Sequence, residues 1–297
     1  MQLLRSLIFV PGNRPNMLER ALGFNADIIM VDLEDSVPAA EKAAARDLAK
    51  EWVPRLRQAG RRVMVRANSL DTGLTRDELA ALVSPDLYGV SVGKTESAWD
   101  LREIDRILAP LEAAAGLEHG CIRLIPWIES ARAIVNVHEM AAALPRTVAI
   151  AFGAEDYTND MGIQRTDDGA EVYHPRATVA IAARAAGIAS LDSPYVAFRN
   201  PEGLRQDAGA ARRMGYTGKF AIHPAQIDAI NELFSPLPED VDYARRVVAA
   251  WDEAETAGRG SLALDGKMVD VPVVKRARNL LALVEAIEQQ LAGRDGD

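Results

Sequence analysis

The sequence of 297 residues has little cysteine, no long apolar run and a deficit of positive charge. Its single cysteine, Cys121, excludes an intramolecular disulfide framework and a zinc cluster of thiolates, and it fits a reducing compartment. No apolar run approaches the ~20 residues of a membrane-spanning helix, and the N-terminal stretch lacks the length and cleavage site of a signal peptide. We therefore expect a cytoplasmic protein with no membrane partner.

The charge balance also limits the partners. Lys and Arg number 34 against 43 Asp and Glu, and the net charge is -9. Nucleic-acid-binding proteins carry basic patches, so this balance disfavours a nucleic-acid partner. Hydrophobic residues (48%) and charged residues (26%) occur at ordinary globular frequencies, which excludes a disordered chain.

Eight short apolar runs recur along the chain, and a helical pattern follows each of them. Their nearly continuous hydrophobicity is typical of strands buried on both faces of a parallel sheet. Uninterrupted alternation predicts an α/β fold, and the count of eight predicts a closed (β/α)8 barrel. A doubly wound open sheet is the alternative, weakened because no GxGxxG follows the first run. The runs are residues 6–11, 27–33, 62–66, 87–92, 122–128, 148–152, 188–192 and 219–223.

The pattern changes after the eighth run. The patterns over residues 224–234 and 238–257 predict helices. A hairpin turn is predicted at Asp265 and Gly266, which stand between apolar residues. Pro272 begins a final helix. We therefore expect a barrel domain over residues 1–225 and, over residues 226–297, a C-terminal helical extension that carries a short hairpin.

Polar residues follow the predicted strands, where barrel enzymes carry their chemistry. Glu129 and Asp156 follow consecutive strands, which lie ~4.8 Å apart. Two carboxylates at one rim, with no thiolate nearby, point to a magnesium site. The alternative is that each is a solvated loop carboxylate or a helix cap.

Arg66 ends the third predicted strand and offers a planar fork for the carboxylate of an anionic substrate. The alternative is an ion pair with Glu34 or Asp35 of the neighbouring strand. Arg14, in the turn after the first strand, and Lys94, after the fourth, belong to the same rim.

Several segments resemble those of the citrate lyase beta-subunit-like enzymes of the HpcH/HpaI aldolase superfamily, a group that includes malyl-CoA and citramalyl-CoA lyases. They include RSLIFVPGNRPNMLERAL, ADIIMVDLEDSVPAAEKAAAR, IPWIESARAIVN, AFGAEDYTNDMGIQRT and LDGKMVDVPVVKRAR. The resemblance runs from about Arg5 to about Leu291, nearly the whole chain. One departure is Gly93, which stands where the family usually has proline and so changes the loop after the fourth strand.

The resemblance implies site residues as well as a fold. It implies a (β/α)8 barrel that binds Mg²⁺ through Glu129 and Asp156, with Arg66 as the substrate-binding arginine. It also implies a catalytic aspartate in the MVDVP motif at residues 268–272, Asp270, which reaches the active site of a neighbouring subunit. The spacing of polar residues alone does not single out Asp270. The family forms trimers and hexamers, so we expect a homo-oligomer.

The expected reaction is the reversible cleavage of a 3-hydroxy-3-carboxyacyl-CoA, such as malyl-CoA, citramalyl-CoA or citryl-CoA, to acetyl-CoA and a 2-oxo acid. Arg66 would hold the substrate carboxylate and Asp270 would transfer a proton at the acetyl carbon. Arg14 and Lys94 would contact the substrate or the CoA phosphates. Backbone N–H groups would assist Arg66, contributed by Gly153, Ala154 and Glu155.

Three other functions remain open on the sequence. The chain could be the beta subunit of a multi-subunit citrate lyase that acts on a carrier-bound citryl group. The same site could give malate synthase or thioesterase activity. A non-catalytic metabolite-binding protein is disfavoured because both predicted metal carboxylates are present.

Overall fold

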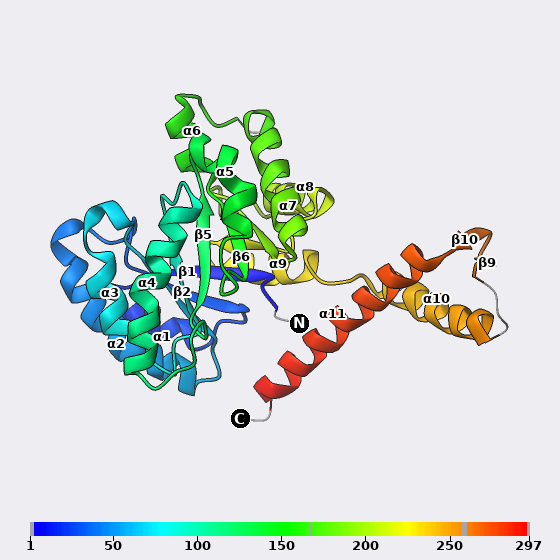
Figure 1. Cartoon of the computed structure of the whole chain (residues 1–297), viewed down its shortest axis with the longest axis horizontal. Coiled ribbons are helices and arrows are strands. Elements are labelled where there is room, and N and C mark those ends of the chain that lie inside the picture. The colour runs from blue at the N-terminus through cyan, green and yellow to red at the C-terminus, as the bar shows by residue number, and fades with distance from the viewer. Residues whose placement is uncertain (1–2, 167, 257–259, 296–297) are drawn as a thin grey trace. The chain divides into compact units, whose positions relative to one another are not determined.

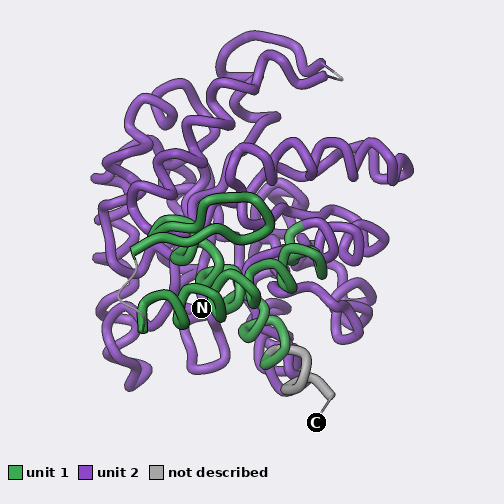
Figure 2. Tube along the Cα trace, turned by 90° about the vertical axis from the view of Figure 1, so that its right-hand side faces the viewer, with its two compact units in different colours: residues 1–3, 234–297 green, residues 4–233 purple. Residues whose placement is uncertain are grey.

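The chain forms two compact units, one of residues 4–233 and one of residues 1–3 and 234–297 (Figure 2). The computed structural model describes residues 3–166, 168–256 and 260–295. The division falls between Leu233 and Phe234, so the short helix α9 (Ile227–Leu233) is part of the first unit.

The first unit is a closed barrel of eight parallel strands in chain order (Figure 1). Strand β1 pairs with both β2 and β8, which closes the sheet and excludes the doubly wound alternative. Each strand overlaps one of the eight apolar runs, so the predicted barrel is confirmed. The strands are β1 (Ser6–Pro11), β2 (Ile28–Asp32), β3 (Val63–Ala67), β4 (Gly89–Val92), β5 (Arg123–Ile128), β6 (Ala149–Phe152), β7 (Ala189–Asp192) and β8 (Gly218–Ala221).

Helices connect the strands, and side-chain caps fix where several of them begin. Ser97 and Asp100 form a capping box at the start of α4, and Ser130 caps α5 three residues before Ala133. The helices of this unit are α1 (Pro15–Ala21), α2 (Lys42–Gln58), α3 (Thr75–Leu82), α4 (Ala98–Ala114), α5 (Ala131–Ala141), α6 (Ala154–Met161), α7 (Tyr173–Ala186), α8 (Pro201–Met214) and α9, with 3₁₀ turns at Ala39–Glu41, Leu70–Thr72, Ala170–Val172 and Pro224–Gln226.

Alternate residues of the strands fill the barrel interior, as the pleat requires. Three aromatic rings form one layer of this core: the centroid of Phe220 lies 5.0 Å from that of Phe9 and 4.5 Å from that of Trp127. Smaller apolar side chains complete the cluster, among them Leu7, Met30, Met64, Ile125, Ala151 and Leu191. The interior is therefore a packed core, and any chemistry belongs to its ends.

The second unit contains two helices and a hairpin. Helix α10 (Pro238–Thr256) and helix α11 (Val271–Asp295) flank the antiparallel strands β9 (Leu262–Leu264) and β10 (Lys267–Val269). Asp265 and Gly266 both have positive φ, 52° and 73°, as a two-residue type I′ turn demands. The predicted hairpin and helical extension are confirmed. No helix in the described residues combines the length and apolarity of a membrane span.

A buried ionic cluster joins the last two strands to their helices. Lys219 of β8 is fully buried and contacts the carboxylates of Asp192 in β7 and Asp207 in α8. Arg176 of α7 completes the cluster by donating to both oxygens of Asp192 at 2.7 and 2.6 Å. Opposite charges and hydrogen bonds thus satisfy each group that the closure of the barrel buries.

Replacement of Asp192 by asparagine should lower the free energy of unfolding by about 3–5 kcal/mol. Lys219 and Arg176 would stay charged and buried, and they would share the one remaining carboxylate, that of Asp207. Urea denaturation followed by circular dichroism measures the change. The matched control is Asp47→Asn, whose exposed ion pair with Arg46 should contribute less than about 1 kcal/mol. Equal effects of the two substitutions would show that the buried cluster is not a special source of stability.

Candidate active site

The closed sheet gathers predicted site residues from distant segments at the C-terminal ends of the strands. Arg66 lies in β3 beside Asp32 of β2. Lys94 follows β4, Glu129 follows β5, and Asp156 lies in the first turn of α6. The structure therefore brings together four of the predicted residues, Arg66, Lys94, Glu129 and Asp156, closely enough that their charges affect one another.

Arg66 rests on the aromatic layer of the core. Its guanidinium carbon lies 4.5 Å from the ring centroid of Phe9 and 6.0 Å from that of Trp127. A cation over the face of an aromatic ring is attracted by the negative centre of the ring. The guanidinium is thereby held at the boundary between the apolar core and the polar rim.

Most of the guanidinium fork is engaged within the protein. Its Nε and Nη2 atoms donate to the two carboxylate oxygens of Asp32, each at 2.7 Å. Its Nη1 atom lies 3.2 Å from Glu34 and 3.2 Å from Asp35. The ion pairs that the sequence offered as an alternative are thus present. A substrate that binds Arg66 would share Nη1 with Glu34 and Asp35, whose contacts are longer than those of Asp32 with the other two nitrogens.

Glu129 fits into its position because glycines stand on both sides of it. A Cβ atom on Gly153 would lie 2.5 Å from Glu129 Oε2, and one on Gly93 would lie 3.1 Å from Glu129 Oε1 and 2.8 Å from Glu34 Oε1. Such distances are shorter than ordinary van der Waals contacts. The absence of a side chain at Gly93 therefore lets the Glu34 and Glu129 carboxylates approach the same loop.

The backbone of Lys94 holds Glu129 from the other direction. Lys94 has a φ of 53°, a left-handed conformation that is uncommon outside glycine and that gathers at functional sites. In this conformation its N–H donates to Glu129 Oε1 at 2.6 Å, while its Nζ donates to Glu34 Oε1 at 2.9 Å. One residue thus links both carboxylates.

Acidic groups outnumber basic groups at this rim. The pKa of Glu129 is raised to about 8, chiefly by burial and also by the carboxylates of Asp156 and Glu34, although the Lys94 N–H lowers it. Burial and Asp35 likewise raise the pKa of Asp156. The Asp32 carboxylate, in contrast, keeps the pKa of Arg66 above its usual value despite burial. The excess of crowded carboxylates is what a bound cation relieves.

A divalent cation of the magnesium type fits these donors. Glu129 and Asp156 offer hard carboxylate oxygens, and Mg²⁺ is usually held by one or two carboxylates together with waters and substrate oxygens. No group of three acidic, histidine or cysteine side chains forms a ready-made cage in the described parts of the chain. The arrangement therefore suits an ion that keeps open positions, and it does not suit a closed structural metal site.

The backbone donors predicted at the start of α6 are used unequally. The N–H of Gly153 donates to the Ile128 carbonyl and that of Ala154 donates to Ser193 Oγ. The N–H of Glu155 has no partner within the described residues, and its exposed side chain pairs with Arg165. Of the three, Glu155 has the N–H group left to face a ligand at the positive end of the helix dipole.

Two further predicted residues are Arg14 and Asp270. Arg14 is exposed at the N-cap of α1, after β1, and forms no ion pair in the described parts of the chain. Asp270 belongs to the second unit, where its carboxylate accepts from the N–H of Val273 at the start of α11. Its catalytic role stays a prediction.

Asp32 and Glu34 are part of the site although the sequence reasoning did not select them as functional. Asp32 binds the fork of Arg66, and Glu34 bridges Arg66 and Lys94. The signal that could have found them is strand adjacency: Asp32 ends the strand next to that of Arg66 and Glu34 follows it by two residues, so both meet the same rim.

Replacement of Gly93 by alanine should reduce the affinity for Mg²⁺ about 10–100-fold, because the new methyl group would displace the Glu129 and Glu34 carboxylates. Titration calorimetry with MgCl₂ measures the change. Gly209→Ala in helix α8 is the control, since its Cβ would meet only the Arg213 side chain at 3.5 Å. Unchanged affinity in Gly93→Ala would contradict the role given to the missing side chain.

Comparison with known proteins finds relatives over nearly the whole chain. The citrate lyase subunit beta of Leuconostoc mesenteroides subsp. cremoris is 37% identical over 96% of this chain and 94% of its own length. The (3S)-malyl-CoA thioesterase of Cereibacter sphaeroides (strain KD131) is 35% identical over 95% of each chain.

Solved structures match both the fold and the sequence. The protein CitE from Mycobacterium tuberculosis, solved in complex with magnesium, acetoacetate and coenzyme A, has a TM-score of 0.74 and 31% identity, over 94% of this chain and 97% of its own. The sequence profile of one family matches residues 5–224, which include the whole barrel sheet. The chain therefore belongs to the HpcH/HpaI aldolase/citrate lyase family.

Proposed function

We propose that the chain is a Mg²⁺-dependent carbon–carbon lyase that cleaves a 3-hydroxy-3-carboxyacyl-CoA reversibly to acetyl-CoA and a 2-oxo acid. The observation that carries the proposal is the pair of crowded carboxylates, Glu129 and Asp156, beside the Arg66 guanidinium at the C-terminal end of the barrel. The related CitE structure with magnesium, acetoacetate and coenzyme A supports the choice of ligands.

The reaction requires one face that binds a carboxylate and a hydroxyl group. In this proposal Nη1 of Arg66 and the N–H of Glu155 bind the carboxylate and orient the bond that breaks. Mg²⁺ bound to Glu129 and Asp156 supplies a Lewis acid for the hydroxyl and carboxylate oxygens. Lys94 positions Glu129 through its N–H and offers an exposed side chain to the CoA part of the substrate, and Arg14 offers a second.

Cleavage also requires a proton donor. When the bond breaks, the hydroxyl group loses its proton to a base and becomes the carbonyl group of the 2-oxo acid. The electron pair of the bond passes to the thioester enolate, and a proton must reach the carbon that becomes the methyl group of acetyl-CoA. We assign that step to Asp270, as acid in cleavage and as base in condensation. The assignment rests on the MVDVP motif and includes delivery of Asp270 from a neighbouring subunit of a homo-oligomer, trimeric or hexameric.

The similarity to two relatives supports two related reactions as alternatives. Similarity to citrate lyase subunit beta favours a citryl group on a carrier as a possible substrate, and similarity to (3S)-malyl-CoA thioesterase favours hydrolysis of the thioester from the same site. Both alternative reactions would use the same rim of the barrel. They differ from the leading proposal in the substrate or the product, and not in the residues that bind the substrate.

Product analysis with purified protein, Mg²⁺ and, separately, malyl-CoA, citramalyl-CoA and citryl-CoA tests the proposal. We expect acetyl-CoA and one 2-oxo acid from one of the three, and no product with EDTA. Glu129→Gln and Asp156→Asn should each lower turnover at least about 10³-fold, because a metal contributes several kcal/mol to such a step. Glu139→Gln, which removes an exposed acid from helix α5, is the control and should keep full activity.

The other outcomes point to defined alternatives. Release of free CoA and the hydroxy acid without acetyl-CoA would support the thioesterase. Absence of product from all three substrates, with Mg²⁺ still bound, would contradict the proposal and favour the carrier-dependent subunit. Full turnover in Glu129→Gln would refute the metal assignment.

Mixed oligomers test the delivery of Asp270 between subunits. Glu129→Gln and Asp270→Asn should each be inactive alone, but coexpression should restore about a quarter of the wild-type activity, because random mixing gives that share of sites an intact residue from each subunit. Activity per purified mixed oligomer is the measurement. Absence of any recovery in verified mixed oligomers would place Asp270 and Glu129 of one chain in the same site.

A further inference from the structure

Lys42 is a half-buried cation whose hydrogen bonds all go to uncharged oxygens of the described residues. Its Nζ atom donates to the backbone carbonyls of Leu33 and Glu34 and to the side-chain Oδ1 atom of Asn68, each at 2.7 Å. An ammonium group has three N–H donors, so these three bonds use all of them. The side chain is therefore held at one point between three segments of the barrel.

The position of Lys42 in the sequence does not by itself favour a cation. Lys42 is the first residue of α2, and the first turn of this helix contains no acidic residue. The positive end of a helix dipole disfavours a cation in the first turn. The contacts of the Lys42 side chain are therefore the feature that favours lysine here.

The two carbonyl groups keep a donor without Lys42. The Leu33 carbonyl also accepts from Asn68 Nδ2 at 2.9 Å. The Glu34 carbonyl also accepts from the Val37 N–H at 3.0 Å. Loss of the ammonium group would thus leave neither carbonyl without a hydrogen bond. What Lys42 adds is a connection between the start of α2, the turn after β2 and the segment after β3.

The turn that Lys42 holds carries Glu34 to the polar rim. Glu34 Oε1 accepts from Lys94 Nζ at 2.9 Å. The backbone N–H of Lys94 donates to Oε1 of Glu129, the proposed Mg²⁺ ligand, at 2.6 Å. A continuous series of contacts therefore joins Lys42 to the carboxylate of Glu129.

The left-handed backbone of Lys94 makes this series sensitive to the position of Glu34. A φ of 53° is costly for a residue with a side chain, and it persists where several contacts hold the residue. Glu34 supplies one such contact by binding the end of the Lys94 side chain. A shift of the turn after β2 would weaken that contact and disturb the N–H group that meets Glu129.

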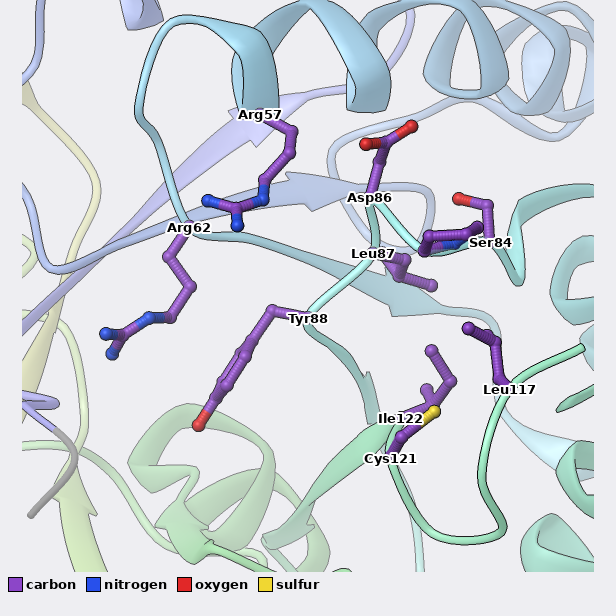
Figure 3. Close-up of a pocket in the computed structure, with 10 residues that line it drawn as sticks. Arg57, Arg62, Ser84, Asp86, Leu87, Tyr88, Leu117, Cys121 and Ile122 are labelled. Carbon is purple, nitrogen blue, oxygen red and sulfur yellow. The ribbon is translucent and has the colours of Figure 1, made fainter. Parts of the chain in front are cut away.

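The other end of α2 takes no part in these contacts. Arg57, in the last turn, lines a cavity of about 400 Å³ together with Asp86 and Cys121 (Figure 3). Lys42 and Arg57 lie at opposite ends of a helix of 17 residues, which is ~25 Å long. A substitution of Lys42 therefore affects the rim directly and not this cavity.

We propose that Lys42 is a positioning residue of the Mg²⁺ site. It fixes the turn after β2, so that Glu34 holds Lys94 in the conformation that places the Glu129 carboxylate. Lys42 itself touches neither the metal nor the substrate. The inference rests on the metal ligands of the proposed function, and it does not depend on which acyl-CoA is cleaved or which products form.

Calorimetric titration of the full chain with MgCl₂ tests the proposal. Lys42→Met keeps an unbranched side chain and removes the three donors. It should weaken Mg²⁺ binding about 10–100-fold, the usual effect of losing a group that orients a metal ligand. Lys50→Met is the matched control, because it removes the same charge from an exposed position of the same helix. It should change the affinity less than about twofold.

Two further variants keep the test independent of folding and of charge. Urea denaturation verifies that each variant is folded, and Lys42→Gln replaces Lys42→Met if the latter is not. Lys42→Arg keeps the charge, but a planar guanidinium cannot direct three donors from one nitrogen toward the three oxygens. It should therefore bind Mg²⁺ as weakly as Lys42→Met. Wild-type affinity in Lys42→Arg would show that charge alone suffices and would overturn the positioning role.

A double-mutant cycle tests whether Lys42 acts through Glu34. In a chain that carries Glu34→Ala, Lys42→Met should change the Mg²⁺ affinity less than about twofold, because the contact with Lys94 is already lost. Fully additive effects, or unchanged affinity in Lys42→Met alone, would overturn the proposal.

Failure of the proposed function gives a different result. A wild-type chain that binds Mg²⁺ but forms no product would contradict the lyase and leave the cycle of affinities to decide the role of Lys42. A wild-type chain that binds no Mg²⁺ would overturn the metal ligands and this inference together.

Discussion

The guanidinium of Arg66 is the contact on which the polar rim of the barrel depends. It stacks on Phe9, forms a two-point contact with Asp32, and faces Glu34. Closure of eight parallel strands brings the polar ends of all of them to one place, and here most of those ends are acidic. Without a rigid cation at the centre, the carboxylates would repel one another and favour an expanded or protonated rim.

The second constraint is space around Glu129. The barrel wall places this side chain next to the loops after β4 and β6, and only glycine leaves room for it at Gly93 and Gly153. Close packing at this point excludes water from the carboxylate, which explains its raised pKa. If Glu129 binds the proposed Mg²⁺, an acid that is costly to ionise alone would couple binding of the ion to correct placement of the carboxylate.

The barrel could be predicted from the sequence because its signals are local and repeated. Each strand lies in a nearly continuous apolar run, and eight such runs predict a sheet that closes into a barrel. The positions of Glu129 and Asp156 at one rim follow from that count. Two features of the site could not be predicted: the left-handed conformation of Lys94, and the use of the Arg66 fork by Asp32. Both depend on packing between strands. Asp270 is predicted to be catalytic through the family resemblance alone, because nothing in its own surroundings distinguishes it from a helix cap.

The helix dipoles favour acids where a helix begins and bases where it ends, and individual helices of the barrel follow this rule. Every helix after a strand begins at the rim, and its positive end favours acids such as Glu155 and Asp156 in the first turn of α6. The helices end at the other face, where the negative end favours bases such as Arg57 in the last turn of α2. The dipole effect is confined to the first and last turns of a helix, so it does not account for the position of Arg66, which lies in a strand and is held by Phe9 and Asp32.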